Sequence, residues 1–418
     1  MEIRPLIPLL IAAGILLGGN GVQGTLIALR GAYEGFSPTA IGLTGTAYFG
    51  GFLLSCLVIT RILNAVGHIR TFAALSAMAA ASTLLLAMIV EPATWILLRF
   101  IAGFCFAGLF TTIESWLNSG VRNNNRGRML ALYRIIDILA VTGAQFFIPL
   151  FSATGFTIFA VITLMVMLSV VPVSLADRSA PKPPETVRFD LKTIWLLSPL
   201  ACIGCVAIGA TNSAFRLIGP LYAEEIGLSV TDVATFMSAG IIGGAVLQYP
   251  FGYISDRYDR RIVLMFVSAG AVFAGMFITF IAGTSPFMNY LGIFVFGAFA
   301  LPLYSLSAAH ANDHAKPDQF VLVAAGLFFF FALGGMIGPF LSSAIVELYG
   351  ASGLFAFTSV VHTLLIIVAL LRMQARGPVP EEDRKGFRPL LRTSAQNFKL
   401  SLGARTENGS TTDKPSDK

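Results

Sequence analysis

Long apolar stretches alternate with short polar ones along most of the chain. Twelve apolar segments can be counted, over residues 5–29, 38–60, 70–90, 94–119, 128–151, 154–176, 195–221, 231–254, 262–283, 286–309, 319–346 and 351–372. Each segment is long enough for a membrane-spanning helix, which needs about 20 residues. Because an open strand edge cannot face hydrocarbon, this pattern predicts an all-α membrane protein with twelve transmembrane helices. The first segment is expected to be a retained span, since it is too long for a cleaved signal peptide.

The connecting loops fall into two sets that differ in charge. Thirteen Lys and Arg residues lie in or beside the second, fourth, sixth, eighth and tenth connections, whereas the six opposite loops hold only Arg30. Those opposite loops are instead acidic, with Glu34, Glu91, Glu224, Glu225, Asp232 and Glu347. Because basic loops stay on the cytoplasmic side, we expect an inner-membrane protein with both termini in the cytoplasm.

Composition supports this interpretation and excludes other classes of protein. Of the 418 residues, 56% are apolar and only 12% are charged, whereas soluble domains carry about 25% charged residues. A soluble enzyme and a disordered protein are therefore excluded. The net charge of +6 does not indicate nucleic-acid binding, because the basic residues are confined to short loops and the C-terminal tail. We expect the protein to be surrounded by membrane lipid.

The two halves of the chain look related. Gly35-Phe36-Ser37-x-Thr39 precedes the second segment, and Gly227-Leu228-Ser229-x-Thr231 precedes the eighth, 192 residues later. A glycine pair follows each, and this spacing favours a parallel two-fold repeat. We therefore expect a six-helix bundle over residues 1–176, a central cytoplasmic linker over 177–194, a second six-helix bundle over 195–372 and a disordered cytoplasmic tail over 373–418.

Sites for metals, nucleotides or catalysis are not expected. Cys202 and Cys205 form a C-x-x-C pair, but they lie among small apolar residues, as is typical of helix packing. His310 and His314 have the spacing of a metal pair on a helix, yet only Asp313 is near and a third ligand is not obvious. No G-x-x-x-x-G-K-[ST] loop is present, which argues against ATP as the energy source. We therefore expect neither a cofactor nor an enzyme activity.

A charged motif follows the eighth segment: Gly252-x-x-x-Asp256-Arg257-x-Asp259-Arg260-Arg261. It resembles the signature loop of the major facilitator superfamily, in which an aspartate pairs with a neighbouring basic residue and a helix end. The resemblance implies that Gly252, Asp256, Arg257 and Arg261 form a cytoplasmic gate. Two departures weaken this analogy, since Asp259 replaces the usual glycine and the N-terminal counterpart reads Thr60-Arg61 without an aspartate. A plain basic turn is the alternative.

Further motifs are similar to the YcaD-like bacterial branch of this superfamily. They are Gly21-x-Gln23-Gly24-Thr25, Glu114-Ser115-Trp116-Leu117-Asn118 and Tyr304-Ser305…His310-x-Asn312-Asp313. The resemblance covers about residues 5–372 and implies two pseudo-symmetric six-helix bundles around a central cavity. It assigns no substrate. Glu114 lies near the cytoplasmic boundary and is a candidate for the gate or for proton coupling.

Ionisable residues within the spans are candidates for a functional cavity, because charges in the bilayer are costly. Arg99 is similar to the arginine of the superfamily's second motif, although it could instead reach the membrane surface along its apolar stem. Arg134 and Asp137 are three residues apart and so able to touch, and Gln145 returns to nearly the same helix face. Their ion pair could serve coupling or only structure.

Uncharged polar residues complete the candidate cavity. Asn20 and Gln23 lie among glycines in the first segment, which predicts either a locally bent, cavity-lining helix or close packing between helices. The remaining candidates are Asn212, Arg216, Gln248, Tyr290 and Tyr304.

The sequence as a whole predicts a secondary active transporter of a small organic solute. Alternating access follows from the resemblance and the repeat, and Asp137 and Glu114 are carboxylates available for proton coupling. Efflux is slightly favoured over uptake, although no motif decides the direction. The alternative is a membrane sensor or scaffold with a transporter-like fold that moves nothing. We expect a monomer whose partners are its solute and membrane lipids.

Overall fold

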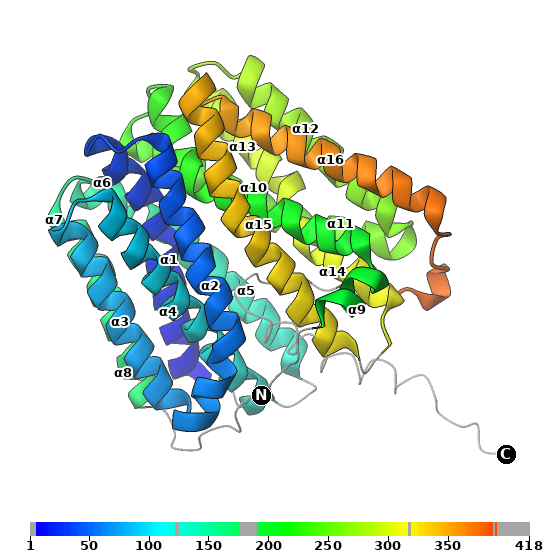
Figure 1. Ribbon diagram of the computed structural model, residues 1–418, viewed down its shortest axis with the longest axis horizontal. Helices are drawn as coiled ribbons and strands as arrows, with labels where there is room; N and C mark the ends of the chain where they lie inside the picture. Colours follow the sequence, from blue (N-terminus) through cyan, green and yellow to red (C-terminus); the bar gives the residue numbers. More distant parts are fainter. Residues whose placement is uncertain (1–5, 122–124, 176–189, 317–318, 388, 391–418) are drawn as a thin grey trace.

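The computed structural model describes residues 6–121, 125–175, 190–316, 319–387 and 389–390 (Figure 1). Within these residues, twelve helices are long and apolar enough to cross a membrane, which confirms the predicted all-α fold. The first half comprises α1 (Ile7–Tyr33), α2 (Pro38–Val66), α3 (His68–Met88), α4 (Pro92–Gly120), α5 (Arg126–Gln145), α6 (Phe147–Phe151), α7 (Phe156–Leu168) and α8 (Val170–Ser174). The second comprises α9 (Leu191–Leu197), α10 (Pro199–Glu225), α11 (Val230–Arg257), α12 (Arg260–Phe280), α13 (Pro286–Ala300), α14 (Leu303–His314), α15 (Phe320–Tyr349), α16 (Gly353–Ala375) and the 3-10 turn η4 (Glu381–Asp383).

Three predicted spans consist of two helices each, in contrast to the single helices expected. The breaks separate α5 from α6, α7 from α8, and α13 from α14. Pro149, Pro172 and Pro302 lie at or up to three residues beyond these breaks. Proline lacks an amide hydrogen and its ring clashes with the carbonyl four residues earlier, which accounts for the interruptions. In contrast, α1 runs unbroken through its glycine-rich stretch.

The same backbone contacts recur in both halves. A Cβ on Gly51 of α2 would overlap the carbonyl oxygen of Phe100 on α4, and a Cβ on Gly103 would overlap that of Tyr48. In the second half, α11 and α13 repeat the arrangement: Gly243 meets the carbonyl oxygen of Phe294, and Gly297 meets that of Gly240. Gly243 and Gly240 lie 192 residues after Gly51 and Tyr48. The repeat seen in the sequence is thus also a repeat of helix packing.

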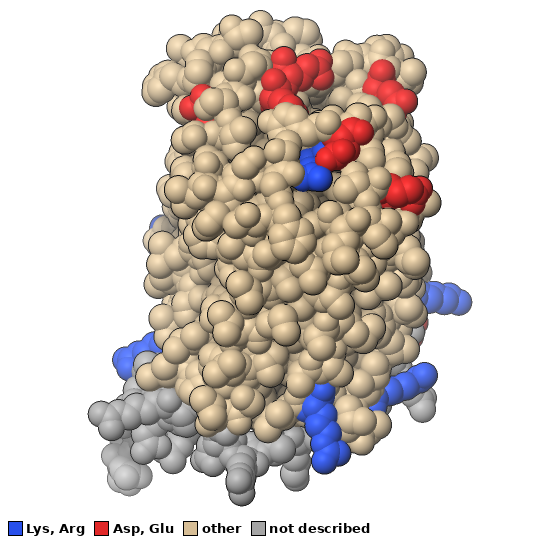
Figure 2. All heavy atoms as spheres, turned by 90° about the vertical axis from the view of Figure 1, so that its left-hand side faces the viewer, with Lys and Arg blue, Asp and Glu red and all other residues tan. Residues whose placement is uncertain are grey.

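Opposite charges mark the two ends of the molecule. Figure 2 shows acidic side chains near one end of the first-half face and basic ones near the other, with an uncharged band between them. We call these the acidic end, where α1 ends and α2 begins, and the basic end, where α2 ends and α3 begins. At the acidic end the two halves are joined, because the backbone amide of Thr39 donates to Glu347 Oε2 at 3.0 Å.

The halves meet mainly along three helix pairs. Between α1 and α10, a Cβ on Gly24 would lie 3.0 Å from the carbonyl oxygen of Arg216. Between α2 and α15, Phe49 packs edge-on against Phe331 with ring centroids 6.3 Å apart. Between α5 and α11, Ser238 Oγ donates to the carbonyl oxygen of Thr142 at 3.4 Å. These contacts position the polar side chains of the interior.

Part of the segment predicted as a disordered tail is ordered. The structure describes residues 373–387 and 389–390 of it, while the rest of 373–418 lies outside the described residues. The amide of Lys385 donates to Asp313 Oδ1 at 2.7 Å, and Leu390 is only 6% exposed. The prediction failed here because these contacts use backbone amides, which leave no trace in composition. Residues 177–189 of the predicted linker also lie outside the described residues, and 191–194 belong to α9.

Candidate functional site

A cavity of about 130 Å³ lies between the two halves. Helices α1, α2, α4, α5, α10 and α15 all contribute to its wall. Six of the polar residues singled out in the sequence line it: Asn20, Arg99, Arg134, Asp137, Asn212 and Arg216. The structure thus brings together residues from four helices that are far apart in the sequence.

The ion pair of α5 connects the two halves. Arg134 Nη1 lies 2.8 Å from Asp137 Oδ2, so the predicted contact is present. Arg134 Nη2 also donates to Gln248 Oε1 on α11 at 2.9 Å, and Gln248 Nε2 donates to Ser305 Oγ on α14 at 2.9 Å. Through these contacts Arg134 links Asp137 of α5 to α11 and α14 of the second half.

Arg99 points into the protein and not along its stem to the membrane surface. It is 5% exposed, and its Nη1 donates to Gln23 Oε1 at 2.8 Å. Its guanidinium carbon lies 4.3 Å above the centre of the Tyr48 ring, a cation–π contact that helps to hold an otherwise costly charge. The Tyr48 hydroxyl donates to Asn20 Oδ1 at 2.9 Å. Asn20 and Gln23 therefore tie α1 to α2 and α4.

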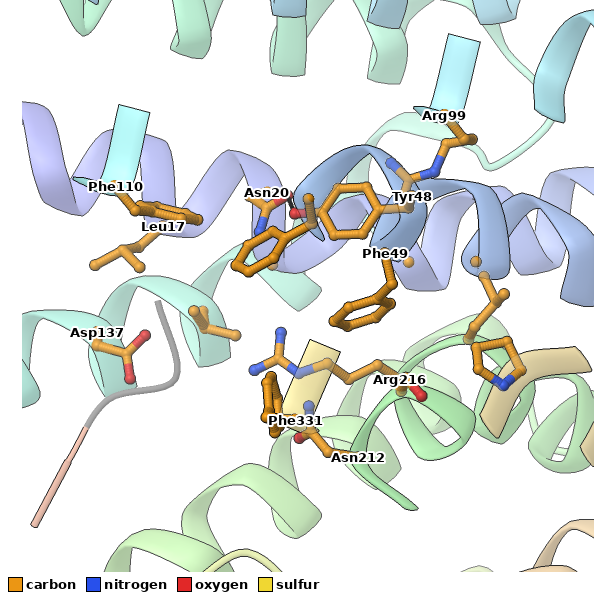
Figure 3. A pocket seen from close by; sticks show the side chains of 18 of the residues that line it. Leu17, Asn20, Tyr48, Phe49, Arg99, Phe110, Asp137, Asn212, Arg216 and Phe331 are labelled. Carbon is orange, nitrogen blue, oxygen red and sulfur yellow. Dashed lines mark hydrogen bonds between the residues drawn. The ribbon is translucent and has the colours of Figure 1, made fainter. Parts of the chain in front are cut away.

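Arg216 reaches into the cavity from the opposite side. Figure 3 shows its side chain extended from α10, with the guanidinium turned towards Asp137 and lying close to Phe331. Asn212 lies one helical turn before it and also lines the cavity. Among the described residues, no hydrogen bond or ion pair holds the Arg216 guanidinium.

Gln23, Gln248 and Tyr304 do not line the cavity, and three further candidates also lie outside it. Gln145 ends α5 and is bonded to α1, where it accepts from Thr25 Oγ1 at 2.8 Å. Glu114 is fully buried, and Tyr133 donates to its Oε1 at 3.1 Å within the first half. Tyr290 lies at the acidic end and donates to Asp232 Oδ1 at 2.7 Å.

Aromatic lining residues were missed by the sequence reasoning. Phe49, Phe52 and Phe331 line the cavity, as does Tyr48, but their segments are apolar throughout and offer no signal that separates lining from packing. Tyr304, in contrast to the expectation, does not line the cavity; it is buried behind it, with its ring 5.4 Å from that of Phe331.

The charged motif at the basic end is arranged differently from the expectation. Asp256 Oδ1 pairs with Arg260 Nη2 at 2.9 Å, whereas Arg257 is exposed and stacks on the Tyr253 ring at 4.4 Å. Arg260 is thus the basic partner; it begins α12, across the short turn that follows α11. It is itself buried and makes a second ion pair with Asp313 at 2.6 Å.

Asp259 and Arg261 form a separate pair in the same motif. Arg261 Nη2 lies 2.7 Å from Asp259 Oδ2, and Arg261 Nη1 donates to the carbonyl oxygen of Arg376 at 2.6 Å. Partial burial favours a raised pKa for Asp259, but the hydrogen bonds and charge of Arg261 prevail and hold that pKa below its usual value. Asp259 therefore stays ionised at neutral pH.

The segment after η4 follows α11 inward from this motif. The amide of Phe387 donates to both carboxylate oxygens of Asp256, at 2.8 and 3.0 Å. Its ring fills the space beside Gly252, where a Cβ would overlap it. Farther in, the amide of Leu390 donates to Ser305 Oγ at 2.9 Å, the same oxygen that accepts from Gln248. We call residues 385–390 the docked segment; only residue 388 of it is outside the described residues.

Comparison with known proteins places the chain among membrane transporters. The family model described as Major Facilitator Superfamily matches residues 9–300 and 200–405. An uncharacterised MFS-type transporter of Enterobacter sp. (strain 638) is 25% identical over 382 residues, covering 90% of this chain and 98% of that protein. The uncharacterised MFS-type transporter YcaD of Escherichia fergusonii is 24% identical over 370 residues, covering 88% and 95%.

Solved structures share the fold at low sequence identity. A variant of the nucleoside transporter NupG has a TM-score of 0.75 at 12% identity and covers 88% of this chain and 99% of its own. A bacterial homologue of the human lysosomal transporter Spinster, in an inward-facing and occupied conformation, has a TM-score of 0.73 at 13% identity, covering 92% and 99%. These structural similarities support only the arrangement of the helices.

Proposed function

This chain belongs to the Major Facilitator Superfamily, and on that premise we propose that it is a secondary active transporter of a small organic solute. The observation that carries the proposal is the polar cavity between two halves with repeated packing. A cavity at a repeat interface can be exposed to either side in turn when the halves rock against each other. The contact between Thr39 and Glu347 would have to break when the acidic end opens.

Proton coupling is the second part of the proposal. Asp137 lines the cavity and its only described ion-pair partner is Arg134. Arg134 in turn contacts Gln248 across the interface, so a proton on Asp137 and a movement between the halves affect the same arginine. Glu114 is less suitable, because it is buried outside the cavity and bonded within the first half.

Solute-dependent proton movement tests the proposed function. The purified protein is reconstituted in liposomes that contain the pH indicator pyranine, and small organic cations, anions and neutral solutes are added in turn. We expect at least one class of solute to produce a saturable change in internal pH that protein-free liposomes do not show. A protein that binds a solute but never moves protons or solute would instead favour the sensor or scaffold alternative.

We further propose that the acidic end faces outward and the basic end faces the cytoplasm of an inner membrane. The segregation of charge between the ends supports this orientation. An epitope added after Lys418 should bind antibody only when cells are permeabilised, and binding to intact cells would reverse the orientation.

A further inference from the structure

The charges that line the cavity do not balance. Three guanidinium groups, those of Arg99, Arg134 and Arg216, face one carboxylate, that of Asp137. Asp137 is paired with Arg134 at 2.8 Å. Within the described part of the chain, neither of the other two arginines has an acidic partner. The lining therefore carries a surplus of two positive charges.

Such a surplus is unusual inside a membrane protein. Arginine stays protonated in proteins, and buried charges are normally paired because an isolated one is costly. The contacts of Arg99 with Gln23 and Tyr48 satisfy only part of its guanidinium, since Nε has no hydrogen-bond partner among the described residues although Arg99 is 95% buried. Arg216 is turned towards Asp137, but in the described part of the chain no hydrogen bond or ion pair holds its guanidinium. The missing counter-charge is what a ligand could supply.

We propose that the transported solute is a small organic anion whose carboxylate or phosphate group binds Arg216, with Arg99 adding favourable charge from the opposite wall. This inference rests on the proposed transport function and names its substrate class. Guanidinium groups bind these anions through paired N–H donors. The side-chain amide of Asn212, one helical turn before Arg216, offers a further N–H donor to the anion (Figure 3).

The remainder of the wall indicates the shape of the solute. Phe49, Phe331 and the Tyr48 ring form an aromatic surface next to Arg216, suited to a flat or apolar body. The cavity volume is about 130 Å³, close to the 150 Å³ of an engineered cavity that holds benzene. A single ring with one anionic group therefore matches both the size and the charge of the site.

Three probes of nearly the same shape show whether charge determines binding. They are benzoate, benzamide and benzamidine, which carry one negative charge, no charge and one positive charge. Each is added to the purified full-length protein, and thermal unfolding is followed. Ligands that bind the folded state raise the unfolding temperature by mass action. We expect benzoate to raise it by several degrees at millimolar concentration, and benzamide and benzamidine to leave it unchanged. Phenyl phosphate shows whether a phosphate serves as well as a carboxylate.

Variants locate the binding site. Arg216→Gln should weaken benzoate binding at least tenfold, Arg216→Lys should retain part of it, and the exposed Arg61→Gln should leave it unchanged. Equal stabilisation by benzamide, no benzoate effect with wild type, or full benzoate binding by a folded Arg216→Gln variant would each overturn the anion proposal. None of these results would affect the transport proposal, which the proton-movement assay tests. If Arg216→Gln does not fold, the anion proposal is still tested by the three probes on the wild type and by whether Arg216→Lys binds benzoate more weakly than the wild type.

Discussion

Asp137→Asn is expected to abolish uphill transport while leaving the protein folded. Asparagine has nearly the same shape as aspartate, and its side-chain oxygen can still accept a hydrogen bond from Arg134 Nη1, which lies 2.8 Å from the carboxylate in the wild type. It cannot take up and release a proton. A carrier that has lost its proton site can still let solute run downhill, but a pH gradient no longer drives accumulation. We expect accumulation to fall to about the level of protein-free liposomes.

The measurement uses liposomes with an imposed pH gradient and the solute identified by the binding probes. Glu34→Gln is the matched control, because Glu34 also pairs with an arginine, Arg30 at 2.7 Å, but lies at the acidic end outside the cavity. Uphill transport by Asp137→Asn equal to that of wild type would exclude Asp137 as the coupling site. Loss of folding would show that the ion pair with Arg134 is structural.

Removal of residues 385–418 is expected to expose the interior at the basic end. Asp256, Gly252 and Gln248 lie one helical turn apart on α11. The docked segment runs along them in this order. Phe387 contacts Asp256 and Gly252, and Leu390 then bonds to Ser305, which Gln248 also contacts. The segment therefore extends inward over about two helical turns, roughly 12 Å. Without it, Asp256 loses two hydrogen bonds, and Ser305, which is 1% exposed, loses its cover.

Thiol labelling measures this exposure. A Ser305→Cys substitution, in a chain that also carries Cys56→Ala, is treated with a membrane-impermeant maleimide in inverted membrane vesicles. We expect labelling at least tenfold faster when the chain ends at Arg384 than when it is complete. A chain that ends at Leu390 keeps every described contact of the docked segment and is the control. Equal labelling of all three chains would show that the segment does not shield this position.

Local signals explain which parts of the fold were predictable. Helix starts are set by nearby residues: Ser37 Oγ accepts from the amide of Ala40 at 3.2 Å, as expected of a capping serine before a proline. The contact between Arg134 and Asp137 was predictable for the same reason, since their spacing of three fixes it. Helix breaks were harder to foresee, because Pro220, Pro250 and Pro339 lie inside unbroken helices.

Contacts between distant elements could not be predicted from spacing. Arg99 meets Gln23 and Arg134 meets Gln248 across helices, and only the packing determines those partners. Gln145 was placed on the face of Arg134, but α5 ends at this residue and its side chain turns to α1. The pairing of Asp256 with Arg260 was missed because the analogy pointed to the adjacent Arg257.

The glycine contacts within each half have a mechanical consequence. Where Gly51 meets Phe100 and Gly243 meets Phe294, the contacting carbonyl oxygens belong to the main chain and have no rotamers with which to yield. Each of these helix pairs is therefore stiff towards sliding. Between the halves the corresponding approaches are wider, with a Cβ 3.0 Å from the carbonyl oxygen of Arg216 at Gly24 and 2.6 Å from that of Pro339 at Gly42, and side chains such as Phe49 and Phe331 make other contacts. The interface between the halves is therefore the more deformable one. The two halves should thus move as nearly rigid bodies that tilt about their shared interface, with little sliding of helices inside either half.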